Sequence, residues 1–209
     1  MNLSLNEIEA IAKRAARGAG YEWGVAEEAG KATRWLCAQG LDGATELARL
    51  LQREFPVTLE QHVPSELNDK WAGEEALCPL MTGATLSDHA DIRHPGPLEL
   101  QHVAVPLLLL PFVANMAFAR NNSITMTMDG CTAVTDGTRL SCPDCDNAHA
   151  DHVVIAVGGV LENTRPCHTR AHPDPAAWQV LTSFAHRTYA PATEESRLLG
   201  AGAGLSDND

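Results

Sequence analysis

The chain has 209 residues, of which 44% are hydrophobic and 20% are charged, and its formal net charge is −12. This length suits one domain of ordinary size, and the apolar fraction is sufficient for a core that needs no disulfides. An acidic chain with only 15 Lys and Arg residues repels polyphosphate, so we expect no nucleic-acid partner.

No segment of the sequence predicts export or membrane insertion. The opening MNLSLNEIEA carries Glu7 and Glu9 and lacks the basic start and apolar run of a secretory signal. The longest apolar run, Val103–Ala114, contains two prolines and is shorter than the roughly 20 residues that span a bilayer. We expect a cytoplasmic protein in which this run is buried at the centre of the fold. In that compartment the cysteines should remain thiols or metal ligands.

Three helices are predicted over residues 3–55. Ser4 and Glu7 have the spacing of a capping box at the start of the first helix. Gly40 suits the end of the second helix, and Asp42 suits the N-cap of the third. Many alanines in the first two helices predict a close approach between them.

The segment that follows has a weaker pattern. Glu66–Trp71 predicts at most a short helix. Met81–Pro97 is interpreted as a loop because glycine and proline recur in it.

Strand patterns begin at Leu98. Alternation of apolar residues with threonine is clearest at Ser123–Met128, and two Asp-Gly pairs are typical hairpin turns. The predicted strands are Leu98–Val105, Ser123–Met128, Cys131–Thr135, Thr138–Ser141 and Val153–Val157. We expect those in residues 123–157 to form an antiparallel meander.

A final helix is predicted to begin at Asp174-Pro175, with aspartate as its cap and proline in its first turn. A second, short helix is predicted from Thr193 to Leu199. The expected fold class is therefore α+β, with an N-terminal helical part, an antiparallel β-meander and a C-terminal helix. We expect a single domain over residues 1–209, with a helical part at 1–72 and a mixed part at 98–209.

Cysteine and histidine are concentrated between Cys142 and His172, where 31 positions hold seven of the chain's fifteen such residues. Zinc prefers these ligands, and a Cys-x-x-Cys turn is a common zinc half-site. The predicted metal ligands are Cys142, Cys145, His149 and His152. Cys167 or His168 could replace one of them. The alternative interpretation is a polar loop with reduced surface thiols.

Three blocks of sequence resemble a family of uncharacterised bacterial proteins, found mainly among proteobacteria. They are LSLNEIEAIAKRAARGAGYEWGVAEEAGKATRWL, VAVPLLLLPFVA and RTYAPATEESRLLGAGAGLSDND. The resemblance implies a cytoplasmic bacterial protein and assigns no activity, cofactor or catalytic residue.

A fainter resemblance links residues 3–55 to the malate/L-lactate dehydrogenase type of NAD(P)-dependent oxidoreductase. That family follows its second helix with Gly-x-Asp-Ser-His-Gly, which carries a substrate-site histidine. The equivalent stretch here is Gly40-Leu-Asp42-Gly43-Ala44-Thr45, without the Ser-His pair. The difference argues against that catalysis in this chain.

The leading hypothesis is an accessory protein that binds a ligand, a metal or a partner, because no complete catalytic constellation or phosphate-binding glycine loop is recognisable. No catalytic or cofactor-binding residue is predicted. One alternative is a zinc-dependent hydrolase or lyase that uses the Cys142–His172 segment. Another is a structural subunit of a larger enzyme, with Val103–Ala114 as an interface. A protein partner or a homo-oligomer is compatible with each hypothesis.

Overall fold

The computed structural model describes residues 1–89 and 96–189. Both helices and strands are present in this part of the chain. The helices are α1 (Leu5–Gly18), α2 (Trp23–Ala38), α3 (Gly43–Leu51), α4 (Pro79–Asp88), α5 (Leu110–Arg120) and α6 (Pro175–His186), with the 3₁₀ segments η1 (Phe55–His62) and η2 (Pro106–Leu109). The strands are β1 (Leu3–Ser4), β2 (Lys70–Trp71), β3 (Leu98–Ala104), β4 (Ile124–Met128), β5 (Cys131–Thr135), β6 (Leu140–Ser141), β7 (His149–Val157) and β8 (Arg170–Ala171).

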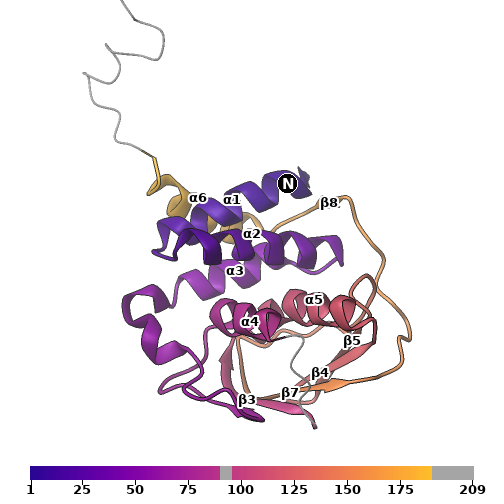
Figure 1. Ribbon diagram of the computed structural model, residues 1–209. Coiled ribbons are helices and arrows are strands. Elements are labelled where there is room, and N and C mark those ends of the chain that lie inside the picture. Colours follow the sequence, from indigo (N-terminus) through magenta and orange to yellow (C-terminus); the bar gives the residue numbers. More distant parts are fainter. Residues whose placement is uncertain (90–95, 190–209) are drawn as a thin grey trace, which may run out of the picture.

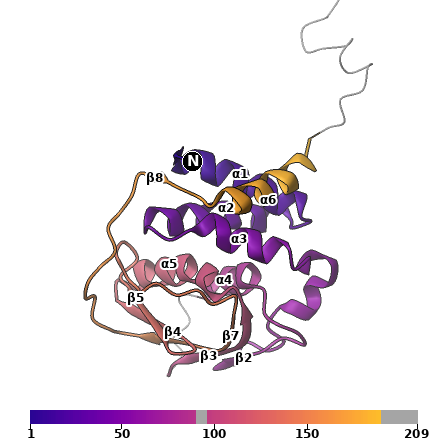
Figure 2. The same cartoon turned by 180° about the vertical axis from the view of Figure 1, so that it is seen from behind.

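These elements form three layers (Figures 1 and 2). A mixed sheet makes the first layer, α4 and α5 cover one of its faces, and α1, α2, α3 and α6 pack beyond them. Within the described residues the sheet has six strands in the order β2-β3-β7-β4-β5-β6, and β1 pairs separately with β8. The predicted α+β class is confirmed.

The three predicted N-terminal helices are present, and local capping explains where they begin. The Ser4 side chain accepts a hydrogen bond from the Glu7 backbone N–H, and the Glu7 carboxylate accepts one from the Ser4 N–H. Asp42 caps α3 by accepting from the Thr45 N–H at 3.1 Å. At Gly43 a Cβ would press on the Thr33 carbonyl, so glycine permits the close approach of α3 to α2.

Two predictions for residues 66–97 are wrong. The segment expected to be a short helix instead supplies β2, which pairs in parallel with β3 while Trp71 is buried. The segment expected to be a loop, Met81–Pro97, contains most of α4. Pro79 stands in its first turn, and Leu80 and Leu86 are buried. Packing against α5 therefore outweighs the weak local signal.

From β3 onward, the sheet agrees with the strand predictions except at β7. Buried methionines alternate with half-buried threonines on β4, as expected. Strand β7 begins at His149, earlier than the predicted Val153, and lies between β3 and β4 instead of following β6. The predicted meander thus holds for β4, β5 and β6 and is wrong for its last strand. Val153 and Ile155 are buried in this central position, which explains the arrangement.

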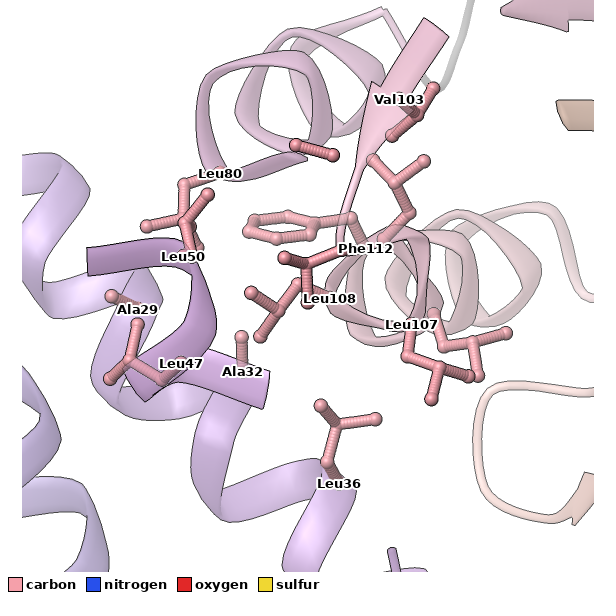
Figure 3. Packing of buried hydrophobic residues seen from close by; sticks show 14 of the residues in the cluster. Ala29, Ala32, Leu36, Leu47, Leu50, Leu80, Val103, Leu107, Leu108 and Phe112 are labelled. Atoms are coloured by element: carbon pink, nitrogen blue, oxygen red, sulfur yellow. The ribbon is translucent and has the colours of Figure 1, made fainter. Parts of the chain in front are cut away.

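The apolar run Val103–Ala114 is buried at the centre of the molecule, as predicted. It includes the end of β3, all of η2 and the start of α5. Figure 3 shows Leu108 and Phe112 among side chains from the other helices, such as Leu47 and Leu80. Within the described residues, no helix is both long and apolar enough to cross a membrane.

The predicted C-terminal helix is also confirmed. The Asp174 carboxylate accepts hydrogen bonds from the N–H groups of Ala176 and Ala177, each at 2.9 Å, and Pro175 is the first helical residue. The short helix predicted from Thr193 lies outside the described residues.

Candidate metal-binding site

Three cysteines meet beside the β5–β6 end of the sheet. Cys131 is the first residue of β5, directly after the Asp129-Gly130 turn. Cys142 follows β6, and Cys145 stands three residues later in the connection to β7. The sulfur atoms of these three residues all lie within 4.8 Å of one another. We call this set the cysteine cluster.

The cluster contains one disulfide and one free thiol. Cys131 and Cys145 are joined in a disulfide, which corrects the expectation that the cysteines all remain thiols or metal ligands. The Cys142 sulfur lies 4.0 Å from that of Cys145. Burial raises the pKa of the Cys142 thiol to about 11, against a smaller opposite effect of Arg165. The free thiol is therefore protonated at neutral pH.

Arginines from distant parts of the chain hold the cysteine loop in place. Arg49 on α3 contacts the Asp146 carboxylate, and Arg53, just after the end of α3, donates to the Ala148 carbonyl at 2.7 Å. On the other side, Arg165 donates to the Cys142 carbonyl at 3.1 Å and to the Asp144 carboxylate at 3.0 Å. The loop is therefore anchored to the helical layer.

A buried carboxyl group lies behind this anchor. Glu46 on α3 pairs with Arg49 at 3.2 Å, and its side chain is only 8% exposed. Its Oε2 atom has no hydrogen-bond partner among the described residues. Burial raises the pKa of Glu46 to about 7, Arg49 opposes the shift, and Asp146 adds to it. The Glu46 carboxyl group, which titrates near neutral pH, therefore lies beside Arg49, one of the arginines that hold the cysteine loop.

The structure brings together two of the four predicted ligands. Cys142 and Cys145 are in the cluster, whereas the strand β7 carries both histidines. His149 lies 2.9 Å from the Asp151 carboxylate instead. The backbone of His152 donates to Asp129, and His152 belongs to neither group of candidate ligands in the described chain.

The candidate ligands that lie farther along the chain are placed beside the helical layer. The His168 backbone N–H donates to the Ala38 carbonyl at the end of α2, and Cys167 is an exposed free thiol. His172 lines a hollow with Asp42 beside the same helices. The Cys142–His172 segment therefore does not form one site.

Sequence reasoning missed Cys131, although the sequence contains a signal for it. The predicted hairpin turn at Asp136-Gly137 sets the register of β5 on β6, where Val134 pairs with Ser141. Continuing that antiparallel register places Cys131 opposite residue 144, between Cys142 and Cys145. Cys131 lies on the preceding strand, outside the Cys- and His-rich stretch that begins at Cys142.

Part of the chain matches one protein family, and the match assigns no activity. No curated protein and no solved structure matches the chain. The faint resemblance to malate/L-lactate dehydrogenases thus finds no support from a named relative. The expected resemblance to an uncharacterised family is confirmed: residues 3–76, which include α1, α2 and α3, match the family described as protein of unknown function (DUF3726).

Proposed function

We propose that this chain is a small accessory protein that binds one zinc ion through Cys131, Cys142 and Cys145. The meeting of three cysteine sulfurs within 4.8 Å carries the proposal. Tetrahedral ligands at the usual Zn–S distance of about 2.3 Å lie roughly 3.8 Å apart. The 4.0 Å between the sulfurs of Cys142 and Cys145 is close to that spacing.

Zinc and the Cys131–Cys145 disulfide are alternatives, because zinc takes thiolates as ligands. We place the protein in a reducing cytoplasm, where the disulfide would open and supply two thiols beside Cys142. Zinc would displace the proton that Cys142 holds at neutral pH. Metal binding at this cluster would therefore depend on the redox state of the protein.

A second candidate function follows from the number of donors. Among the described residues the cluster offers three protein ligands, which leaves a fourth position on a tetrahedral ion. A donor from a partner protein there would suit an accessory role. Water there would suit the alternative, a zinc-dependent hydrolase or lyase, because catalytic zinc sites keep one open position. The structural-subunit hypothesis loses its supporting feature, since Val103–Ala114 is buried within the chain.

Zinc content of the reduced protein tests the proposal. We expect about one zinc per chain after treatment with a phosphine reductant, addition of zinc and removal of the excess. Cys131→Ser and Cys142→Ser should each lower the content well below one. Cys167→Ser is the matched control, because this exposed free thiol lies outside the cluster. A wild-type content well below one per chain would refute the proposal.

Cobalt substitution then separates the two functions. Co²⁺ in the same site should show charge-transfer absorption from sulfur, together with d–d bands that report the fourth ligand. A small anion that shifts those bands would indicate exchangeable water, which the enzyme requires and which the accessory role allows only while the partner is absent. Bands that do not respond in the protein alone would indicate a fourth donor from a second copy of the chain and would exclude the enzyme.

A further inference from the structure

A second group of metal-ligating side chains lies on two neighbouring strands. His102 is on β3, whereas His149 and Asp151 are on β7. One ligand atom from each residue lies within 4.8 Å of the others. We call these residues the His–Asp cluster, and it shares no member with the cysteine cluster.

Local irregularities in both strands bring these side chains together. The pairs Gln101↔His152 and Val103↔Ala150 leave His102 opposite Asp151. His102 has a positive φ of 51°, a conformation that histidine seldom adopts. On β7, Asp151 and His152 are both exposed although they are consecutive, so strict alternation is lost at this point.

A neighbouring carboxylate stabilises the irregular part of β7. Asp129, in the turn between β4 and β5, accepts hydrogen bonds from the backbone N–H groups of Asp151 at 2.7 Å and His152 at 2.9 Å. These bonds satisfy backbone donors of β7 and fix the backbone that carries Asp151. One member of the cluster is therefore positioned before any ion binds.

The distances between donor atoms suit a single cation. His149 Nε2 lies 2.9 Å and His102 Nδ1 3.4 Å from the same oxygen, Asp151 Oδ1. For bonds of about 2.1 Å, neighbouring ligand atoms lie roughly 3.0 Å apart in an octahedron and 3.4 Å apart in a tetrahedron. The two imidazole rings are stacked, with centroids 6.0 Å apart and planes 14° apart. Small side-chain rotations would direct all three donors at one ion.

We propose that His102, His149 and Asp151 bind a divalent first-row transition-metal ion at a site separate from the cysteine cluster. Two imidazoles and one carboxylate suit zinc, copper, nickel, cobalt or ferrous iron, whereas magnesium and calcium prefer oxygen ligands. The side chains of His102 and Asp151 are each 64% exposed. Solvent can therefore reach the remaining positions on the ion, and a small ligand with anionic or chelating groups could bind there.

The charge of the group supports cation binding. Asp151 contributes a carboxylate, and its Oδ1 atom lies within 3.4 Å of a ring nitrogen of each histidine. The whole chain is also acidic, with a formal net charge of −12.

Titration of the reduced full-length protein with Co²⁺ alone tests the proposal, because the two clusters differ in spectrum. A cobalt ion at the cysteine cluster absorbs through sulfur charge transfer, whereas one at the His–Asp cluster does not. We expect calorimetry to detect one equivalent of bound Co²⁺ that adds no charge-transfer absorption. His102→Ala and Asp151→Asn should each weaken this equivalent at least tenfold while leaving any sulfur-dependent absorption unchanged.

His152→Ala is the matched control, because this neighbouring histidine lies on the same strand outside the cluster. It should bind cobalt as the wild type does. Circular dichroism checks that each variant is folded, which we expect because the substituted side chains are exposed. Unchanged binding in folded His102→Ala and Asp151→Asn, or loss of the equivalent in His152→Ala alone, would overturn the proposal. Either result would leave the zinc test of the cysteine cluster unaffected.

Discussion

Glu46 should make the stability of the protein depend on pH. Burial raises its pKa from 4.5 in the unfolded chain to about 7 in the folded protein. The folded state then binds more protons than the unfolded state between these values, so stability falls as pH rises through this window. Between pH 5 and pH 8 the loss from this group should be on the order of 2 kcal/mol.

Glu46→Gln should remove this contribution. We expect the free energy of unfolding, measured in urea at pH 5 and at pH 8, to change less in the variant than in the wild type. Glu99→Gln serves as the control, since Glu99 is an exposed carboxylate on β3. Other groups also contribute to the pH profile of the whole protein, so the informative quantity is the difference between variant and wild type. Parallel pH profiles for Glu46→Gln and the wild type would contradict the prediction.

At the scale of single residues, the sequence predicts contacts between residues that are close together along the chain. Cys142 and Cys145 are close because only two residues separate them, and their meeting follows from spacing alone. Cys131 depends on the pairing of β5 with β6, and His102 depends on the pairing of β3 with β7. Periodicity predicts strands but not which strands become neighbours. The parts of both clusters that come from another strand were therefore missed.

Among the elements, α4 is a helix that packing stabilises although its local sequence predicts a loop. Gly83 in its middle disfavours a helix in isolation. In the fold, a Cβ at Gly83 would overlap the ring of Phe112, which is itself only 1% exposed. Glycine is therefore needed there for the contact between α4 and α5. Elements with strong caps, such as α1 and α6, were predictable because their signals are local.

Gly83→Ala should consequently destabilise the protein, although alanine is the better helix former. Overpacking of a closed core typically costs about 1 to 3 kcal/mol, which exceeds the gain in helix propensity of up to about 1 kcal/mol. Gly24→Ala is the control, because a Cβ at Gly24 in α2 meets no atom within 4 Å. We expect thermal unfolding to show a lower midpoint for Gly83→Ala and an equal or higher one for Gly24→Ala. A Gly83→Ala variant as stable as the wild type would show that Phe112 can move.

Over the whole molecule, the region that matches DUF3726 is completed by residues outside it. The match ends at residue 76, yet α1 and α3 pack against α6, which begins at Pro175. At Gly18 in α1 a Cβ would overlap the Phe184 carbonyl of α6, so the two helices are in direct contact. Strand β1 pairs with β8, and β2 joins the large sheet beside β3. Figure 1 shows both ends of the described chain in the same helical layer.

We therefore predict that residues 1–76 do not fold alone and that the chain unfolds as a single domain. The isolated fragment would leave the apolar faces of α1 and α3 without Leu181 and Phe184, which are buried in the full chain. It should show no cooperative thermal transition and poor dispersion in its amide NMR spectrum. Mixing it with a fragment of residues 77–209 should restore a cooperative transition, because the missing packing surface is then supplied in trans. In the full chain, Leu181→Ala should lower the midpoint of one transition, whether circular dichroism or tryptophan fluorescence follows it. A cooperative transition of the 1–76 fragment by itself, with native-like chemical shifts, would instead establish the matched region as an independent domain.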